Sequence, residues 1–298
     1  MFCSTVYGGN TEVAFLKVPV GARAVGMGQA FITIGEGVSA MLWNPAGLAK
    51  IQSSEIFITH MELYIDNWLD FIGYGFPTRR GILGISGLYL FQGEIKARNS
   101  NREDLGNFST SDLAVTVSFA KNLNKINQAG GNLKLIQKRL GDESAVGLAM
   151  DIGGTFLTPI SPLTVSVVLQ NMGPKMKFLE KSFSLPITLK FGALYRTNRW
   201  LFLASDINYL PIESNFTISF GSEFIISQIL SLRAGYLSSV THAKNASSFG
   251  SGQENGLDSL SNFSSGLGLK IYRYQLDYAF LPFGELGTSH QFSLTARF

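Results

Sequence analysis

The sequence predicts an all-β fold, a transmembrane antiparallel β-barrel of about fourteen strands with an N-terminal segment in its lumen. Apolar and polar residues alternate along most of the chain after residue 53, and a period of two is typical of a strand with two unlike faces. Most alternating segments have about 9–12 residues, the length that a strand needs to cross a bilayer at a tilt. The connections between them alternate between long and short.

The last strand is the clearest, because Phe292 and Leu294 lie on one face and Ser293 and Thr295 on the other. By the same pattern we predict strands at 54–62, 69–77, 81–91, 110–121, 129–140, 146–157, 162–171, 186–197, 199–208, 215–226, 229–238, 260–271, 273–281 and 288–298. Long connections follow the odd-numbered strands and short turns follow the even-numbered ones. Bacterial outer-membrane barrels separate short periplasmic turns from longer outer loops in this way.

The composition agrees with a membrane barrel. Hydrophobic residues make up 45% of the 298 residues and charged residues 15%, whereas a soluble domain carries about 25% charged residues. No run of about 18 apolar residues indicates a transmembrane helix. A net charge of +3 with scattered Lys and Arg does not favour nucleic acid as a partner. The single Cys3 excludes an internal disulfide.

The N-terminal residues 1–14 are predicted to be an arm without a complete signal peptide. Either export needs a segment upstream of this start, with Cys3 near a processing site, or the protein stays inside the cell. An inert free thiol is the simpler interpretation of Cys3.

In a membrane barrel the polar face of each strand lines the lumen. The inward-facing charges are then predicted to be Asp151, Glu223, Arg233, Arg273, Asp277 and Arg297. A barrel of about fourteen strands is too wide for its own side chains to fill, since about eight strands already fill theirs. We therefore predict that residues 15–52 form a luminal plug and that 53–298 form the barrel. An arm packed over a soluble core is the alternative.

Glycines allow such a plug to fold compactly against the wall, and those of its signature are Gly21, Gly26, Gly28 and Gly47. Asn44-Pro45 predicts a turn. Arg23 is expected to pair with an inward carboxylate of Asp151, Glu223 or Asp277.

The stretch "FLKVPVGARAVGMGQAFITIGEGVSAMLWNPAGLA" resembles the N-terminal signature of the PorV/PorQ family of bacterial outer-membrane proteins, and the resemblance continues through "LPITLKFGALY" to "LDYAFLPFGELGTSHQFSLTARF". The wider FadL-like superfamily shares an Asn-Pro-Ala element in a luminal plug. The resemblance thus implies that Asn44, Pro45 and Ala46 belong to the plug, flanked by Trp43 and Gly47. It also implies a fourteen-stranded barrel in the bacterial outer membrane, whose C-terminal Phe298 is read by the assembly machinery.

The family resemblance implies a non-enzymatic protein-interaction or shuttle component of a type IX-like secretion or surface-attachment system. Its partners would be outer-membrane lipid, translocon or attachment subunits, and exported cargo. Contacts would come from loops 92–109, 172–185 and 239–259, on the extracellular side, with the N-terminus on the periplasmic side. The alternative is a FadL-like transporter for small hydrophobic molecules, which needs an apolar pocket beside the plug and a lateral opening. A soluble β-rich protein is the third hypothesis.

We predict no catalytic residues, no metal site and no cofactor. The histidines are His60, His242 and His290, and Ser289 points away from its neighbour His290 because adjacent strand residues face opposite sides. One Cys and dispersed His do not match a metal-ligand spacing. Gly26-Met27-Gly28 lacks the third glycine and the preceding strand of a dinucleotide site.

Overall fold

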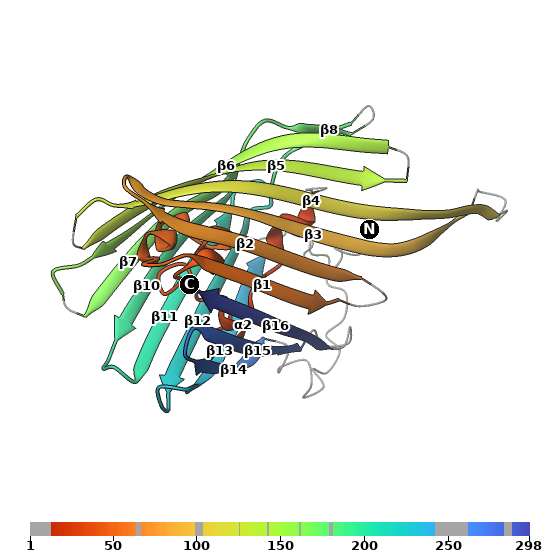
Figure 1. Ribbon diagram of the computed structural model, residues 1–298. Helices are drawn as coiled ribbons and strands as arrows, with labels where there is room; N and C mark the ends of the chain where they lie inside the picture. The colour runs from red at the N-terminus through yellow and green to blue at the C-terminus, as the bar shows by residue number, and fades with distance from the viewer. Residues whose placement is uncertain are drawn as a thin grey trace.

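The computed structural model describes residues 13–63, 67–98, 104–124, 126–141, 143–160, 162–178, 181–241, 262–282 and 288–298. In this part of the chain, fourteen strands close into one antiparallel barrel (Figure 1), in the order β1-β16-β15-β14-β13-β12-β11-β10-β7-β6-β5-β4-β3-β2. The predicted fold class and strand number are confirmed. The barrel closes where β1 meets β16, with Glu55 opposite Arg297.

The barrel strands are β1 (Glu55–Glu62), β2 (Trp68–Thr78), β3 (Gly81–Arg98), β4 (Asp104–Asn122), β5 (Asn127–Leu140), β6 (Glu143–Leu157), β7 (Leu163–Met172), β10 (Thr188–Arg196), β11 (Leu201–Leu210), β12 (Asn215–Ile225), β13 (Leu230–Thr241), β14 (Phe263–Ile271), β15 (Tyr274–Pro282) and β16 (Thr288–Arg297). A separate hairpin consists of β8 (Met176–Phe178) and β9 (Lys181–Phe183). One rim carries the short turns, such as 79–80 and 272–273, and is called the short-turn rim; the other is the long-loop rim.

Two of the predicted loops are structured. The segment 92–109 is mostly strand, because β3 and β4 extend to 18 and 19 residues and project beyond their neighbours at the long-loop rim (Figure 1). Alternation is only weak in this stretch, so the predicted end of β3 came too early and the predicted start of β4 came too late. The segment 172–185 contains the β8–β9 hairpin, and the third predicted loop, 239–259, lies largely outside the described residues.

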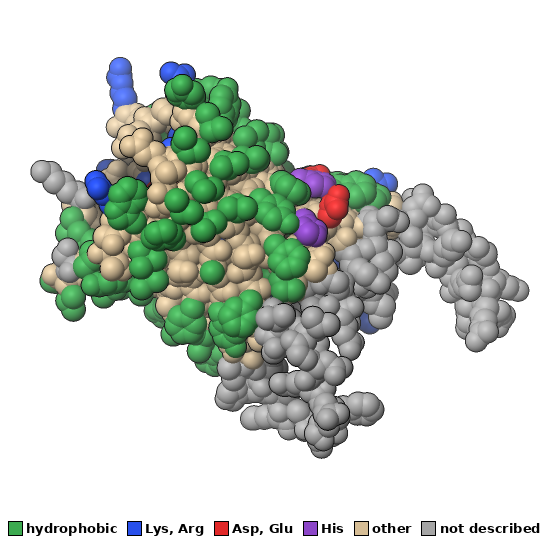
Figure 2. Space-filling view, turned by 90° about the horizontal axis from the view of Figure 1, so that it is seen from below, with side chains coloured by type: hydrophobic (Ala, Val, Ile, Leu, Met, Phe, Trp, Pro, Cys, Tyr) green, Lys and Arg blue, Asp and Glu red, His purple; other side chains and the backbone are tan. Residues whose placement is uncertain are grey.

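The outer wall is apolar because the residues of one face of each strand point away from the lumen. Ile72, Leu133 and Val146, for example, are each more than half exposed. Figure 2 shows the wall covered with hydrophobic side chains over most of its height. No helix in the described residues is long and apolar enough to span a membrane.

Residues 13–51, here called the luminal segment, lie inside the barrel (Figure 1). The segment contains η1 (Ala14–Lys17), α2 (Ala22–Gly26), η2 (Val38–Leu42) and η3 (Pro45–Lys50). Most of its residues are buried. Helices this short are not stable alone, so their conformation depends on the surrounding wall.

Candidate functional site

At Gly28 the luminal segment packs backbone against backbone on the wall. Gly28 has a φ of 62° and lies directly on Gly235 of β13, where an added Cβ at either glycine would meet backbone atoms of the other strand or segment. Gly28 N–H also donates to Ser264 Oγ at 3.0 Å. Any side chain here would hold the segment away from β13, so the glycines of "GMG" and of the wall fit each other.

Polar side chains of the wall bind the backbone of the luminal segment from many directions. Gln291 on β16 accepts from Gly21 N–H at 3.0 Å and donates to the Pro19 carbonyl at 2.8 Å. Asp206 on β11 accepts from the N–H groups of Phe31 and Ile32 at 2.6 and 3.0 Å. Further bonds of this kind come from Glu55, Asn132, Gln170 and Ser293. An irregular backbone in a barrel must find such partners, and the polar inner face supplies them.

The Asn-Pro turn is fixed between β5 and β6. Asn44 caps η3 by accepting from Ala46 N–H at 3.0 Å, and its amide donates to the Ile32 carbonyl at 2.8 Å and to Thr155 Oγ1 at 3.1 Å. A Cβ at Gly130 or Gly153 would collide with this turn. The turn therefore uses both the oxygen and the NH2 group of the Asn44 side chain, and it lies on wall positions that have no side chain.

Trp43 connects two parts of the luminal segment. Its Nε1–H donates to the Val20 carbonyl at 2.9 Å, and its ring meets that of Phe31 edge-on at 5.9 Å between centroids. Lys190 of β10 lies over the same ring at 5.1 Å. This indole joins the α2 end of the segment to the η2 end.

A chain of ion pairs ties α2 to the wall. Arg23 donates to both carboxylate oxygens of Glu223, at 2.9 and 2.6 Å, and to Glu36 at 3.2 Å. Arg233 donates to Glu223 and to Asp277, each at 2.7 Å. Carboxylate and guanidinium groups thus alternate from Glu36 through to Asp277.

The charges of the luminal segment shift one another's pKa. Burial would raise the pKa of Glu36, but Arg23 and Lys50 outweigh burial and hold that pKa below its usual range. Burial lowers the pKa of Lys50 to about 8, with Glu36 offsetting part of the effect. Lys50 Nζ donates to the carbonyls of Thr33 and Gly35 at 3.4 and 3.1 Å.

A second polar cluster lies where the wall is irregular. The β6–β7 ladder shifts register between Met150 and Ile152. Asp151 between them accepts from Asn171 N–H, Asn132 Nδ2 and Lys134 Nζ, each at 2.8 Å. Asn171 has a φ of 58°. Side-chain bonds therefore replace ladder bonds at this seam.

Most of the predicted inward charges do face the lumen, and one does not. Asp151, Glu223, Arg233 and Asp277 are buried on the inner side of the wall. Arg297 lies at the short-turn mouth and donates to Glu55 at 2.8 Å. The prediction for Arg273 is wrong. This residue lies in the exposed turn between β14 and β15, because β15 begins one residue later than predicted. Of the three partners expected for Arg23, the structure selects Glu223.

Other signature residues are placed as follows. Gly21 precedes α2 with a φ of 104°, Gly26 packs on Gly266 of β14, and Gly47 packs on Gly35, all buried within the lumen. Phe298 is exposed, and its N–H donates to the Ser54 carbonyl at 2.8 Å. The first described residues lie toward the long-loop rim, since Lys17 pairs with Glu213 of the β11–β12 loop at 2.8 Å. That is the opposite end from the one we predicted for the N-terminus, although residues 1–12 are outside the description.

Several inward polar residues were not predicted from the sequence. Asp206, Glu55 and Lys134 all lie on alternating strands and bind the luminal segment or the Asp151 cluster. The same alternation that gave Glu223 and Asp277 could have given these three. In the described residues, no group of three or more His, Cys, Asp or Glu is arranged to hold a metal ion.

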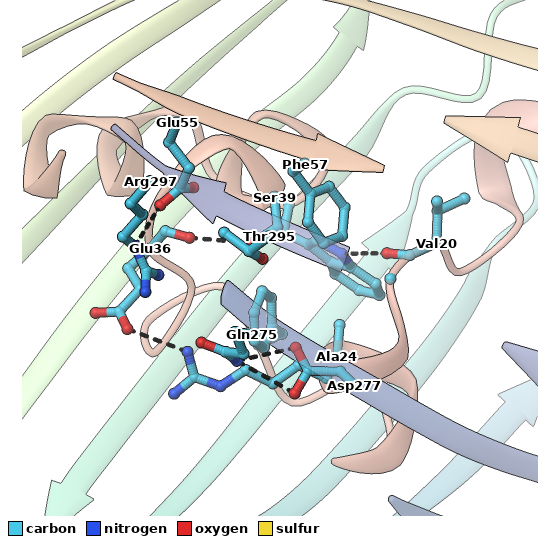
Figure 3. A pocket seen from close by; sticks show the side chains of 14 residues that line it. Val20, Ala24, Glu36, Ser39, Glu55, Phe57, Gln275, Asp277, Thr295 and Arg297 are labelled. Atoms are coloured by element: carbon cyan, nitrogen blue, oxygen red, sulfur yellow. Dashed lines mark hydrogen bonds and ion pairs between the residues drawn. The ribbon is translucent and has the colours of Figure 1, made fainter. Parts of the chain in front are cut away.

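A small cavity opens beside the ion pairs at the short-turn mouth (Figure 3). Its volume is about 20 Å³ and it is lined by Arg23, Glu36, Gln275 and Arg297 together with Trp43 and Phe57. Such a space holds water-sized molecules. Polar side chains and the luminal segment thus fill this end of the lumen.

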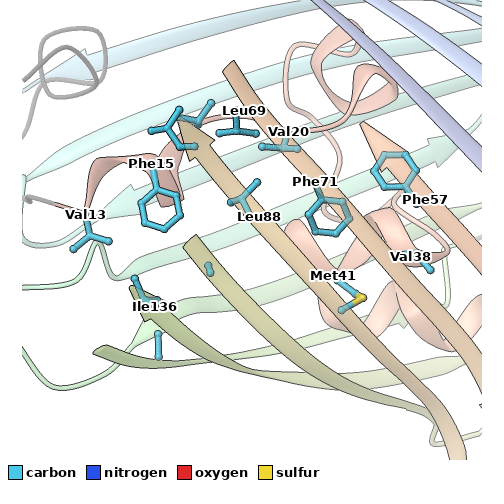
Figure 4. Packing of buried hydrophobic residues seen from close by; sticks show 14 of the residues in the cluster. Val13, Phe15, Val20, Val38, Met41, Phe57, Leu69, Phe71, Leu88 and Ile136 are labelled. Atoms are coloured by element: carbon cyan, nitrogen blue, oxygen red, sulfur yellow. The ribbon is translucent and has the colours of Figure 1, made fainter. Parts of the chain in front are cut away.

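The other end of the lumen is apolar. Inward side chains of β1, β2, β3 and β5 gather there around Phe15 of η1 (Figure 4), including Met61, Leu69, Leu88, Leu90 and Ile136. Met176 of β8 and Leu185 join the cluster from the side. We call this cluster the apolar compartment; Val13 and Phe15 of the luminal segment occupy its interior.

Solved structures with the same architecture were found. The chain is similar to the toluene transporter TodX of Pseudomonas putida (12% identity, 93% of this chain and 96% of that chain covered, TM-score 0.64) and to the toluene transporter TbuX of Ralstonia pickettii (13% identity, 94% and 98% covered, TM-score 0.62). It is equally similar to a FadL homologue of Pseudomonas aeruginosa (12% identity, 94% and 98% covered, TM-score 0.62). The chain has the FadL-like barrel fold.

At these identities the likeness concerns the FadL-like fold alone. No protein-family model matches the sequence, and no curated protein matches it. The similarity therefore supports the FadL-like barrel fold that the resemblance implied and gives no support to the narrower PorV/PorQ resemblance.

Proposed function

We propose that the protein is a non-enzymatic FadL-like transporter that carries small hydrophobic molecules across the bacterial outer membrane. The observation that carries the proposal is the apolar compartment, which lies inside the barrel and next to the luminal segment. A buried apolar surface of this kind binds apolar ligands through the hydrophobic effect. The similar barrels TodX and TbuX are toluene transporters, and this agrees with an apolar cargo.

The luminal segment is the plug in this proposal. Its polar half is bound to the wall by Arg23, Asn44 and the side chains that hold its backbone. Its first described turn, η1, instead packs through apolar contacts, with Phe15 buried among Leu88, Leu90 and Ile136. An apolar molecule that enters from the long-loop rim would compete with Phe15 for these contacts.

The seam between β6 and β7 is the proposed place for a lateral opening. The Asp151 cluster seals it with side-chain bonds where the ladder is interrupted. The seam lies close to the apolar compartment, since Ala145 and Ala149 of β6 belong to that compartment. Opening at this point would break side-chain hydrogen bonds of Asp151 in place of regular ladder bonds.

The test compares two buried phenylalanines. Phe15 and Phe31 are each 1% exposed, the first in the apolar compartment and the second beside Trp43. Phe15→Ala empties part of the compartment, so binding of an environment-sensitive fluorescent apolar probe to the purified protein should become several times tighter. Phe31→Ala is the control, which removes the same side chain elsewhere and should leave probe binding unchanged. Equal effects of both substitutions would contradict the proposal.

The secretion-component hypothesis predicts different behaviour. A component of that kind should bring large secretion subunits or exported proteins with it when it is isolated from gently solubilised outer membranes, and mass spectrometry would identify them. Bound apolar molecules without protein partners would instead favour transport. Nothing in the described residues favours the secretion role over transport.

A further inference from the structure

The short-turn rim carries exposed charges of one sign. Seven described residues there are exposed cations, here called the basic rim: Arg79, Arg80, Lys121, Arg196, Arg199, Lys270 and Arg273. The six turns of this rim, 79–80, 123–126, 158–162, 197–200, 226–229 and 272–273, contain no Asp or Glu. On the face seen in Figure 2, the left-hand end of the wall shows Lys and Arg but no acidic side chain.

These cations are not neutralised within the described chain. Every ion pair among the described residues uses other side chains. Two of the guanidinium groups rest on aromatic rings instead, Arg199 on Trp200 at 4.6 Å and Arg196 on Phe202 at 5.8 Å. At the long-loop rim, by contrast, Glu62 and Glu143 are exposed along with several cations.

The basic rim is spread around the barrel. Its members lie on the β2–β3 turn, the end of β4, the β10–β11 turn and the β14–β15 turn, which are well separated in the strand order. A docked protein would cover one arc, whereas a lipid leaflet surrounds the whole wall. Exposed aromatic side chains, Tyr195, Trp200, Tyr272 and Tyr274, lie at the same level, as aromatic girdles do at a membrane interface.

We propose that the basic rim binds the headgroups of anionic phospholipids in the leaflet at the short-turn end. The inference rests on the membrane location in the proposed function but not on transport. A cation close to an anionic leaflet contributes about 1 kcal/mol, which corresponds to about a fivefold preference for the charged lipid. The basic rim thereby fixes both the height of the barrel in the bilayer and which end of the barrel faces the anionic leaflet.

Two tryptophans allow each rim to be tested separately. Trp200 is exposed beside Arg199, while Trp68 stacks on Phe91 of the outer wall near the long-loop rim. Trp43 is buried in the lumen, out of reach of lipid. The full chain with Trp68→Phe therefore reports lipid at the basic rim, and the chain with Trp200→Phe reports lipid at the other rim.

Each variant is reconstituted in bilayers of phosphatidylcholine and phosphatidylglycerol, with one lipid brominated at a time, and tryptophan quenching gives the relative affinity of the two lipids. We expect about a fivefold preference for phosphatidylglycerol at Trp200 and about none at Trp68. Replacing Arg196 and Arg199 by Gln should abolish the preference at Trp200. Replacing Lys175 and Lys177 of the long-loop rim by Gln is the matched control and should leave it intact.

Equal quenching by the two lipids at Trp200 would overturn the inference, as would a preference that survives loss of Arg196 and Arg199. An equal preference at both tryptophans would also overturn it, because the preference would then not belong to the rim. Failure of the membrane location itself looks different: no brominated lipid, charged or neutral, would then quench either tryptophan.

Discussion

Arg23 of the luminal segment and Glu223 of β12 form a two-point ion pair, with nitrogen–oxygen distances of 2.9 and 2.6 Å. The Glu223 side chain is 2% exposed and that of Arg23 18%. The pair lies at the polar end of the lumen, so it both anchors α2 and fills space that water and ions would otherwise occupy.

Removing this anchor should open an ionic path. In Arg23→Ala, Glu223 keeps Arg233 but loses two charge-assisted hydrogen bonds, each of which contributes about 1.5–3 kcal/mol. Conductance of the reconstituted protein in planar bilayers should rise. Arg139→Ala removes an exposed arginine that bonds only the Gly141 carbonyl among the described contacts and serves as the control. Conductance equal to that of the unchanged protein would refute this role of Arg23.

The backbone contact of Gly28 with Gly235 predicts a strong steric effect. Gly235→Ala places a methyl group on the backbone of Met27 and Gly28, and overpacking of this kind costs about 1–3 kcal/mol. The transition at which the heated protein loses its compact gel mobility should fall to a lower temperature. Gly87→Ala is the matched change, since a Cβ there has no neighbour within 4 Å; similar losses in both variants would mean that the contact is unimportant.

The pair of Lys17 and Glu213 should restrain η1. Their side chains are 9% and 6% exposed, and their nitrogen–oxygen distance is 2.8 Å. A double-mutant cycle with Lys17→Met and Glu213→Gln should give a coupling of about 1–3 kcal/mol, and the single variants should bind the apolar probe more tightly, because η1 leaves the compartment more readily. His60 and Asp70, about half exposed on the outer wall, should show a coupling of about 0–1 kcal/mol. A coupling between Lys17 and Glu213 no larger than that between His60 and Asp70 would show that the first pair does not restrain η1.

The last residue is predicted to matter for assembly. Phe298 is exposed at the barrel seam, where its N–H joins the Ser54 carbonyl. Deleting it should lower the amount of barrel recovered from the outer membrane, whereas Phe298→Tyr, which keeps an aromatic ring, should not. An unaltered amount of barrel in the outer membrane after the deletion would show that assembly does not depend on the terminal aromatic ring.

Alternation predicted the strands well because the barrel wall separates lipid from lumen, so each strand carries one apolar and one polar face. It located Glu223 and Asp277 for the same reason. It failed where the contrast is weak, as in the extended ends of β3 and β4, and at Arg273, where a one-residue error in a boundary moves a side chain from the lumen to a turn.

The apolar compartment was harder to predict. Leu88 lies on a strand whose outward residues are apolar as well, and Ile136 stands next to the inward polar residue Lys134, so periodicity did not indicate an apolar patch in the lumen. The pairing of Gly28 with Gly235 was also beyond local patterns, because it joins residues more than two hundred positions apart. Glycines in the signature indicated a close approach but not its partner.

The hydrogen bonds of Gln291 have a consequence for the order in which the protein folds. Gly21 is held by Gln291, a residue 270 positions later in the chain. Contacts so distant in sequence form late and slowly. The luminal segment must therefore wait, unfolded, until the final strand arrives, and closing the cylinder and seating its interior become one cooperative event. A chain truncated before β16 would lose the residues that bind the luminal segment as well as the strand that closes the barrel.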